Sequence, residues 1–447
     1  MRAFLRSAAF ALLVPFAAAA AAAAALGAQA SSKPATDPYL ARALRVLQTA
    51  PVVDGHNDLP WRIREDTVHP MDVEAYDLRK RTPGMTDLAR LKQGHVGGQF
   101  WSIYIPGEPT DKAYAKKGDV ASLPGYARVQ MEEIDIARRV IAKYPEFQWA
   151  LTADAIRSNF KKGTIASLLG LEGGHAIENS LSLLRLYYDM GARYMTLTHN
   201  VTLDWADAAL DSAKHRGLTP FGREVVREMN RLGMLVDLSH VSPGTMSSAL
   251  DVTEAPVIFS HSASRELVDH PRNVPDSILK RLPKNGGVVM VPFVTAFVSK
   301  AVKADDDSLA AQTQAAAKRH PNDSAAARAE VASWRASHPR PKASISEVAD
   351  HIQHIRSVAG IDHVGIGSDF DGIDENVVGL EDVSTFPALL AELARRGWTD
   401  AELAKLTSGN VLRVLKGAEA VSARLKKTKK PSQATIEELD RGVRPKA

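Results

Sequence analysis

Cysteine is absent from all 447 residues of this chain, which excludes disulfide bonds and the attachment of a lipid to an N-terminal cysteine. An exported protein without disulfides must draw its stability from its hydrophobic core. After the first thirty residues, no apolar run has the length of a membrane span or of a lipid-anchor signal. We therefore expect the mature protein to be soluble, with no stable membrane anchor.

The chain also lacks a dominant block of one charge. Its 56 Lys and Arg residues exceed its 52 Asp and Glu residues by only four, although the sequence pI is about 9.0. Nucleic-acid binding usually depends on clustered basic residues, so we expect no nucleic-acid partner. Apolar residues make up 45% of the chain and charged residues 24%, values typical of a globular protein. A collagen-like, coiled-coil or wholly disordered chain is thereby excluded.

The first thirty residues differ in composition from the rest. Two arginines precede an apolar stretch from Ala8 to Leu26, and Ala28-Gln29-Ala30 fits the small-residue pattern before a cleavage site. This arrangement predicts a signal peptide over residues 1–30, cleaved after Ala30, and export to the periplasm or the medium. The alternative is a membrane anchor, but Pro15 and the weakly apolar alanines argue against it. Loss of the two arginines would lower the net charge from +4 to +2.

From Val52 onward, short apolar runs alternate with helical patterns. Buried, β-branched runs of this kind indicate strands of a parallel sheet, and seven or eight repeats favour a closed (β/α)8 TIM barrel. We expect the barrel to span residues 51–422. The clearest predicted strands are Val52-Val53, Ile165 to Leu171, Tyr194 to Leu197, Met234 to Leu238, Val257 to Phe259, Val288 to Val291 and Val364 to Ile366.

Two predicted helices carry clear end signals. Thr219 and Pro220 form a favourable start, and Gly233 ends the same amphipathic pattern. Ser344 and Glu347 form a capping box before a second helix.

Three segments stand apart from the barrel pattern. Residues 31–50 are predicted to form a linker and a short helix. Residues 300–342 are rich in Ala, Asp, Lys and Arg, which predicts a surface helical insertion. Residues 423–447 contain two Lys-Lys pairs, and this composition predicts a basic, solvated C-terminal tail.

Polar residues follow six of the predicted strands, at the end where barrel enzymes place their active sites. A single His or Asp at such a point usually serves a turn or a cap, but six in succession favour a metal site. Mixed imidazole and carboxylate ligands suit Zn²⁺ and similar ions. The candidate residues are His56, Asp58, Glu172, His199, His240, His261 and Asp369.

The spacing of His56 and Asp58 has a geometric meaning. Alternate residues of an extended segment point to the same side, so both side chains could reach one ion. A carboxylate from another strand could place one oxygen on each of two ions, and water bridging such a pair becomes hydroxide near neutral pH. The pattern thus predicts a two-metal hydrolytic site.

Seven motifs resemble those of the membrane (renal) dipeptidase family of zinc peptidases, in the same order, from about Val52 to about Leu415. They are Val53-Asp-Gly-His-Asn-Asp58, Leu171-Glu-Gly-Gly-His175, Thr196-Leu-Thr-His199, Asp237-Leu-Ser-His240, Phe259-Ser-His-Ser262, Arg272-Asn-Val-Pro-Asp276 and Gly365-Ile-Gly-Ser-Asp-Phe-Asp-Gly372.

This resemblance implies a dipeptidase with two Zn²⁺ ions per chain, in which a metal-bridging hydroxide attacks the peptide bond. It also implies tolerance of a D-residue at the C-terminal side of the substrate and a homodimeric assembly. The implied roles are zinc binding for His56 and Asp58 at one ion and His240 and His261 at the other, bridging for Glu172, oxyanion stabilisation beside the substrate for His199, substrate-carboxylate binding for Arg272 and proton transfer for Asp369.

Two alternatives stay open at this point. The same metal pair could cleave another amide or a lactone, such as an N-acyl amino acid or a β-lactam. A barrel that only binds its ligand is disfavoured, because every implied metal ligand and Asp369 are present. Five further residues are interpreted as structural: His175 and Asp371 in loops, His351 and His354 within a helix, and Trp205 in packing.

Overall fold

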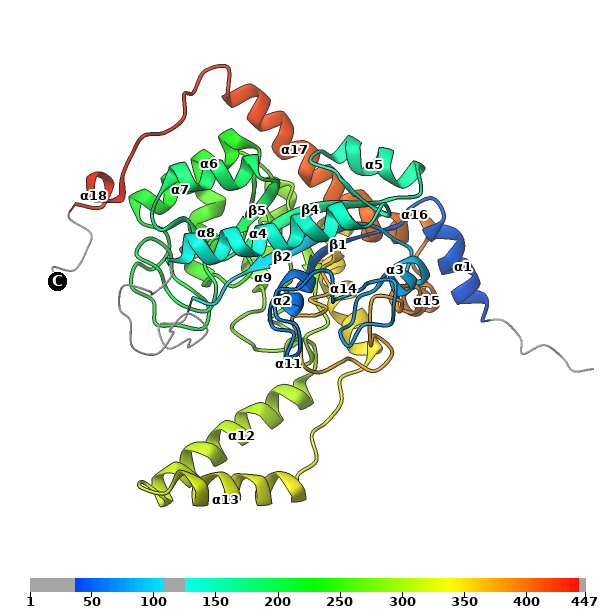
Figure 1. Ribbon diagram of the computed structural model, residues 1–447, viewed down its shortest axis with the longest axis vertical. Coiled ribbons are helices and arrows are strands. Elements are labelled where there is room, and N and C mark those ends of the chain that lie inside the picture. Colours follow the sequence, from blue (N-terminus) through cyan, green and yellow to red (C-terminus); the bar gives the residue numbers. More distant parts are fainter. Residues whose placement is uncertain (1–36, 108–124, 442–447) are drawn as a thin grey trace, which may run out of the picture. The chain divides into compact units, whose positions relative to one another are not determined.

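Parallel strands form a nearly closed eight-stranded barrel that helices surround (Figure 1), as the sequence predicts. The computed structural model describes residues 37–107 and 125–441, so the predicted signal peptide lies outside the described residues. Neighbours around the barrel follow the order β1-β2-β4-β5-β6-β7-β8-β9, and β3 pairs with β4 outside this ring. The strands are β1 (Val52–Asn57), β2 (Val96–Tyr104), β3 (Phe147–Trp149), β4 (Ile165–Glu172), β5 (Ala192–Thr196), β6 (Leu235–Asp237), β7 (Ile258–Phe259), β8 (Val288–Val291) and β9 (Val364–Ile366).

The first and last strands meet at their carboxyl ends. The Asp58 amide donates to the Phe370 carbonyl at 2.9 Å, and the Asp369 amide donates to the His56 carbonyl at 3.1 Å. Ser368 adds a hydroxyl bond of 2.6 Å to the buried carboxylate of Asp54. These bonds close the ring at the edge where barrel enzymes carry their active sites.

The helices fill the connections between the strands. They are α1 (Pro38–Leu47), α2 (Leu59–Arg64), α3 (Leu88–Gln93), α4 (Tyr126–Lys143), α5 (Ala153–Lys161), α6 (Leu181–Asp189), α7 (Pro220–Leu232), α8 (Pro243–Val252), α9 (Asp276–Leu279), α10 (Leu282–Asn285), α11 (Thr295–Val298), α12 (Lys300–Arg319), α13 (Ser324–Ser337), α14 (Ile345–Ala359), α15 (Phe386–Arg395), α16 (Asp400–Ala404), α17 (Asn410–Leu425) and α18 (Ile436–Leu439). Shorter turns are η2 (Gly174–Ile177), η3 (Ile361–His363) and the π-helical η4 (Lys405–Gly409). Among the described residues, no helix is both long and apolar enough to cross a lipid bilayer.

The end signals of two helices are confirmed. The Thr219 side chain accepts a hydrogen bond from the Gly222 amide at the start of α7, and Gly233 ends this helix in the left-handed conformation with φ 90°. The capping box of Ser344 and Glu347 is present at the start of α14. Local sequence therefore determines where these two helices begin.

The strand β2 is missing from the sequence prediction. It begins Val-Gly-Gly-Gln, and the two glycines and the glutamine interrupt the apolar run that indicates a buried strand. Nevertheless β2 lies inside the barrel, buried between β1 and β4. Pro51 and Phe160 pack where a Cβ of Gly97 would lie, at 2.5 and 3.1 Å, so the glycine makes room for neighbouring side chains.

Residues 300–342, the predicted insertion, contain the two successive helices α12 and α13 (Figure 1). Only Val302 and Ala316 of α12 are buried, and no residue of α13 is. Arg335 of α13 pairs with Asp305 of α12 at 2.8 Å. Arg340 pairs with Asp306 and, at 2.5 Å, with Glu375 in the loop after β9. Ion pairs rather than a hydrophobic core thus join the two helices.

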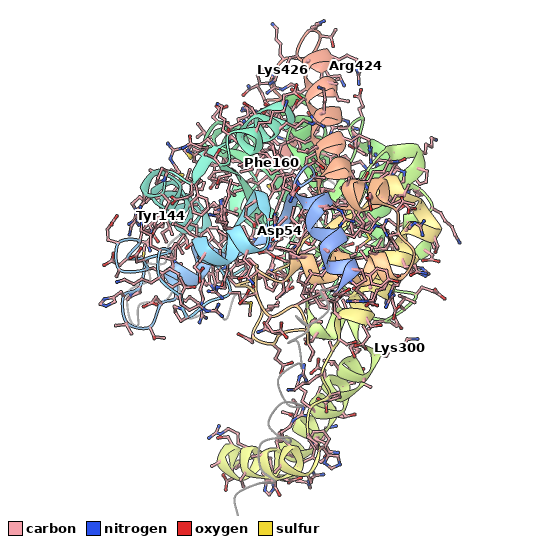
Figure 2. All side chains as sticks on the ribbon, turned by 90° about the vertical axis from the view of Figure 1, so that its right-hand side faces the viewer. Asp54, Tyr144, Phe160, Lys300, Arg424 and Lys426 are labelled. Carbon is pink, nitrogen blue, oxygen red and sulfur yellow. The ribbon has the colours of Figure 1, made fainter. Side chains whose placement is uncertain are left out.

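The described part of the predicted basic tail, residues 423–441, is mostly exposed but contacts the barrel at several points. Residues 423–425 complete α17, where Arg424 and Lys426 lie together (Figure 2). Farther along, Ile436 is buried, and the Asp440 carboxylate accepts a hydrogen bond of 2.9 Å from the Phe221 amide. This segment therefore packs against the start of α7. The two Lys-Lys pairs are exposed, whereas Ile436 and Asp440 lie against the barrel.

Candidate active site

The Glu172 carboxylate lies at the centre of the predicted metal ligands. It ends strand β4, and its two oxygens face different histidines. Oε2 lies 3.3 Å from Nε2 of His56, whereas Oε1 lies 2.9 Å from Nε2 of His240 and 3.4 Å from Nε2 of His261. A carboxylate whose two oxygens face different histidines could bridge two ions.

The remaining candidates surround this centre. The Asp58 carboxylate lies 3.3 Å and the Asp369 carboxylate 3.9 Å from Nε2 of His56. Nε2 of His199 lies 3.8 Å from Oε1 of Glu172. All seven predicted strand-end residues therefore meet at one place, and all except Asp369 are buried. Possible metal-binding groups with mutually close donor atoms are His56–Glu172–His261, Glu172–His199–His240 and His56–Asp58–Asp369.

Two buried atoms of this cluster lack a hydrogen-bond partner among the described residues: Nε2 of His56 and Oδ2 of Asp58. Such orphaned polar atoms are costly unless a further group binds them. In addition, Nε2 of His240 and Nε2 of His261 face each other at 2.9 Å. Imidazole nitrogens and carboxylate oxygens that converge in this way fit zinc or a similar ion.

The protonation states of His240, His261 and Glu172 suit a metal site. Burial holds the pKa values of His240 and His261 well below the ordinary histidine value, with Arg272 nearby adding to the effect. Both rings are therefore neutral, as metal coordination requires. Burial opposes ionisation of Glu172, but His56 and His240 outweigh it and hold the pKa of this carboxyl well below its ordinary value.

The backbone at the site adopts conformations that most side chains avoid. His240, Asp369 and Asp371 each have φ 66°, in the left-handed region. Such strain costs free energy and concentrates at functional sites. Close beside them, a Cβ on Gly372 would lie 2.3 Å from Oδ2 of Asp58, so only glycine lets the chain approach that carboxylate.

A cavity of about 430 Å³ opens over the cluster. Arg272 lines it, although only 1% of this residue is exposed. Its guanidinium makes two long hydrogen bonds of 3.5 Å, to the Ser262 hydroxyl and the His261 carbonyl, and its Nε has no partner among the described residues. Burial lowers the pKa of Arg272 to about 10, so the group remains cationic at neutral pH.

Several residues that line the cavity are missing from the sequence prediction. Tyr104 is the last residue of the unpredicted strand β2, and Phe297 lies in α11, after β8. The sequence could have pointed to them only through their positions at or after the ends of strands. Aromatic residues at such positions more often pack in the core than line an active site. The missed lining residues are Trp61, Arg62, Glu65, Tyr104, Asn200, Val294, Phe297, Gly372, Ile373 and Asp374.

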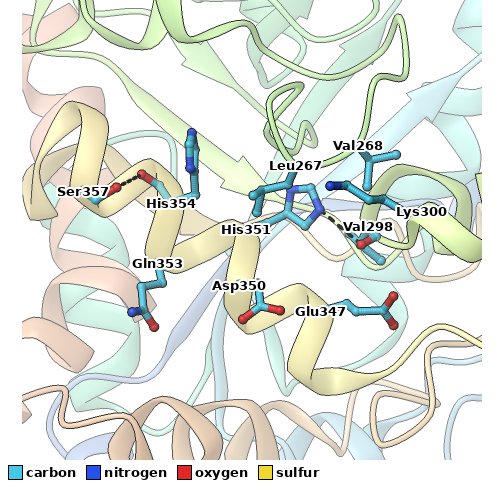
Figure 3. A pocket seen from close by; sticks show the side chains of 10 residues that line it. All are labelled: Leu267, Val268, Val298, Lys300, Glu347, Asp350, His351, Gln353, His354 and Ser357. Carbon is cyan, nitrogen blue, oxygen red and sulfur yellow. Dashed lines mark hydrogen bonds between the residues drawn. The ribbon is translucent and has the colours of Figure 1, made fainter.

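The residues interpreted as structural make structural contacts. His351 and His354 line a second cavity of about 550 Å³ (Figure 3). Their rings have different partners. His351 bonds the Ser264 amide and the Val298 carbonyl, whereas His354 bonds Asp276.

Three loop residues also serve the fold around the site. His175 bonds the Ile105 carbonyl at 3.0 Å, and Trp205 is fully buried against Phe221. Asp371 accepts a hydrogen bond of 2.6 Å from the Met85 amide, yet it also reaches the wall of the active-site cavity.

Comparisons with known proteins find similarity along most of the chain. A family model described as membrane dipeptidase (peptidase family M19) matches residues 40–429. Dipeptidase 3 of Rattus norvegicus is 40% identical over 392 residues, which cover 86% of this chain and 69% of that protein.

Solved structures show the same fold. The probable dipeptidase PvdM from Pseudomonas aeruginosa matches with a TM-score of 0.72 and 26% identity, over 86% of this chain and 99% of that one. A metallo peptidase from Rhodobacter sphaeroides, liganded with a phosphinate mimic of the dipeptide L-Ala-D-Ala, matches with a TM-score of 0.65 and 25% identity, over 83% and 99% of the two chains.

The resemblance drawn from the seven motifs is thereby confirmed. With its converging histidines and carboxylates at the carboxyl ends of the barrel strands, the chain belongs to the membrane dipeptidase family of metallopeptidases, hydrolases that act on dipeptides.

Proposed function

We propose that this protein is an exported dipeptidase that uses two Zn²⁺ ions and prefers substrates with a free C-terminal carboxylate. The observation that carries the proposal is the position of Arg272, a buried cation with an unpartnered Nε, in the same cavity as the metal-binding cluster. A dipeptide spans the short distance between its scissile bond and its terminal carboxylate with a single residue. A cation beside the reacting centre therefore selects dipeptides over longer chains.

The metal ligands follow from the geometry of Glu172. His56 and Asp58 would hold one ion, His240 and His261 the other, and Glu172 would bridge them, since its two oxygens face the two sides. When bound, such a pair of ions lowers the pKa of water and polarises a carbonyl group near neutral pH.

Asp369 and His199 supply the remaining acid–base and electrostatic functions. Burial, together with the nearby Asp58 and Glu172 carboxylates, raises the pKa of Asp369 well above its ordinary value. A raised pKa makes the ionised carboxylate a stronger base, so the carboxylate of Asp369 can take a proton from the attacking water, and the carboxyl group so formed can deliver it to the departing amine. His199, on the cavity wall, would donate a hydrogen bond to the oxygen of the tetrahedral intermediate.

Arg272 would bind the substrate's C-terminal carboxylate through its planar fork of N–H groups. We extend the proposal to substrates with a D-residue at this end. Support comes from the Rhodobacter sphaeroides relative, whose ligand mimics L-Ala-D-Ala. Hydrolysis of a neutral lactone would leave the Arg272 cation without a partner, which disfavours that alternative, whereas an N-acyl amino acid would still satisfy it.

The test combines metal content with hydrolysis. The purified protein would be assayed on L,L- and L,D-dipeptides and on N-acyl amino acids, before chelation, after chelation and after Zn²⁺ is restored. Activity on dipeptides that disappears and returns with about two ions per chain supports the proposal. A fully loaded protein that is inert on every dipeptide overturns it, and activity on N-acyl amino acids alone would identify the alternative.

Export and assembly are further parts of the proposal. The arginines and apolar stretch of residues 1–30 support cleavage after Ala30, and family resemblance supports a homodimer. Expression of the full chain followed by N-terminal sequencing of the exported protein tests the first point, with Ser31 as the expected first residue. Light scattering on the purified protein tests the second.

A further inference from the structure

The three histidines of the predicted metal centre share an arrangement beyond the cluster itself. Each turns Nε2 toward Glu172, and each has its other ring nitrogen, Nδ1, in a hydrogen bond on the opposite side of the ring. The partners of Nδ1 are the Tyr194 hydroxyl for His56 at 2.8 Å, Oδ1 of Asn200 for His240 at 3.1 Å and the Ser260 hydroxyl for His261 at 2.8 Å.

The direction of these bonds decides whether the rings can bind a metal. A neutral imidazole carries one N–H, and the nitrogen that binds an ion must be the one without hydrogen. If Nε2 is to bind, Nδ1 must carry the hydrogen and its partner must accept it. Partners that only accept, or that have already donated their own proton elsewhere, therefore favour the metal-binding tautomer.

Tyr194 meets this condition because of a second contact. Its hydroxyl lies 3.2 Å from the Gly55 carbonyl, which can only accept a hydrogen bond. Once the single hydroxyl proton is donated there, the tyrosine oxygen accepts from Nδ1 of His56. The ring is fully buried and tightly placed, since a Cβ on Gly170 would lie 2.0 Å from it.

The other two histidines reach the same state by different means. The Ser260 hydroxyl donates to Asp237 at 2.6 Å, and this carboxylate also accepts from Thr196 and from two amides. With its proton engaged by Asp237, Ser260 can only accept from His261. Next to His240, the amide oxygen of Asn200 has no hydrogen to donate.

We propose that Tyr194 is a positioning residue that holds His56 in the tautomer with a free Nε2, and that Asn200 and Ser260 do the same for His240 and His261. The inference rests on the proposed function only in requiring a metal at this centre. It concerns affinity for the ion and does not depend on which bond the enzyme cleaves.

The first test is the substitution Tyr194→Phe, which keeps the ring and removes only the hydroxyl. The affinity for Zn²⁺, measured by competition with a chromogenic chelator and without substrate, is expected to fall about 10- to 100-fold. The matched control is Tyr144→Phe, which removes another fully buried hydroxyl, one that accepts from the Leu78 amide outside the active-site cavity. The control should bind Zn²⁺ as tightly as the natural protein.

A spectroscopic measurement separates this role from a general loss of packing. Burial opposes protonation of His56, but Tyr194, Asp58 and Glu172 raise its pKa well above its ordinary value, so the tautomer has to be read at a pH at which this ring is neutral. At such a pH, in the metal-free, ¹⁵N-histidine-labelled protein, the ring nitrogens of His56 should report hydrogen on Nδ1, and Tyr194→Phe should transfer part of it to Nε2. Equal Zn²⁺ affinity and an unchanged tautomer in Tyr194→Phe would overturn the proposal.

A second variant covers the case in which Tyr194→Phe fails to fold. Ser260→Ala should produce the same loss of Zn²⁺ affinity and the same tautomer change at His261, and its failure to do so would count equally against the proposal. A protein that binds Zn²⁺ with these differences yet hydrolyses no dipeptide would refute the proposed function and leave this inference standing.

Discussion

Asp369 combines a strained backbone with a side chain that favours its protonated form. Its φ of 66° turns the carboxyl toward the cavity and the metal-binding cluster, and burial raises its pKa. A raised pKa makes the ionised carboxylate a stronger base, which is the property that a proton-transferring residue needs.

The substitution Asp369→Asn tests this assignment. The amide keeps the size of the side chain but cannot exchange a proton, so kcat should fall about 10²- to 10⁴-fold while metal content stays near that of the natural protein. Steady-state kinetics and elemental analysis measure the two effects. Near-normal kcat would exclude Asp369 as the proton carrier, and loss of metal would instead make it a ligand.

Arg272 is tested through the substrate. Arg272→Ala removes the cation that faces the cavity, so KM for free dipeptides should rise about 10- to 100-fold, the effect of one lost charge-assisted interaction. KM for C-terminally amidated dipeptides should change little, because they carry no carboxylate. Equal increases for both substrate series would contradict carboxylate binding.

The residues that meet at the site could be predicted because they all lie at the carboxyl ends of parallel strands. Parallel strands end at one rim, so His56, Glu172 and His261 must approach one another once each is known to follow a strand. Tyr194 could not be identified in this way, because a tyrosine inside a strand is first of all a core residue. Its contact with His56 depends on a register between non-adjacent strands that one sequence does not reveal.

At the scale of elements, the contact between α2 and α4 contains a titratable group, Glu133, that is not one of the proposed metal ligands. Glu133 of α4 is fully buried and bonds Arg64 of α2 at 3.2 Å. Burial raises its pKa from 4.5 to about 8, although Arg64 opposes the shift. Between these two values the folded protein holds a proton that the unfolded chain releases, so stability should fall as pH rises through this interval.

The variant Glu133→Gln should lack this decline. Each pH unit within the interval is worth up to about 1.4 kcal/mol, so the variant should gain on the natural protein between about pH 5.5 and about pH 8. Chemical denaturation at several pH values measures the difference. Glu132→Gln is the control, since Glu132 bonds the same arginine but is partly exposed. A difference between Glu133→Gln and the natural protein that is constant with pH would refute the expected titration.

The C-terminal segment makes a second element-scale prediction. Asp440 accepts from the Phe221 amide, one of the unpaired N–H groups in the first turn of α7. Asp440→Ala should lower the free energy of unfolding by about 0.5–2 kcal/mol, the usual effect of losing a helix cap. Glu437→Ala in the same short helix is the control, because this residue is exposed. Equal stability of both variants would show that the cap is dispensable.

Element prediction succeeded where the signals are local and failed where they are not. Thr219 and Ser344 mark helix starts through bonds to residues three positions away. The docking of Asp440 on Phe221 spans 219 positions, and no local pattern announces it. Gly97 likewise interrupts the apolar pattern by which β2 could have been predicted. A glycine is needed there because a Cβ would collide with Pro51, a contact that the local sequence does not reveal.

At the scale of the molecule, the site brings together residues from several strands of the barrel. The proposed ligands come from β1 and the residue that follows it, from β4 and from the loops after β6 and β7, so an ion there would join strands that are otherwise held by hydrogen bonds and packing. Binding of an ion to the folded state alone raises stability, by about 4 kcal/mol when the free ion is a thousand times its dissociation constant.

Removal of metal should therefore lower the melting temperature. Calorimetry before and after chelation, with metal content checked in each sample, measures the effect, and added Zn²⁺ should reverse it. Glu172→Ala, which lacks the central carboxylate, should show a much smaller response to the chelator. An unchanged melting temperature after complete loss of metal would argue against ions that link the strands.

The barrel can close only after the ribosome has translated the region around β9, near the end of the chain. Ser368 bonds Asp54, 314 positions earlier, and the residues that follow β9 form backbone hydrogen bonds to the end of β1 and so cover part of its free edge. Until the ribosome has released this region, the nascent chain carries an unpaired strand edge, which is a template for association with other chains. Fragments that stop before β9 should aggregate and hydrolyse nothing, so translation has to finish the barrel before any catalytic unit exists.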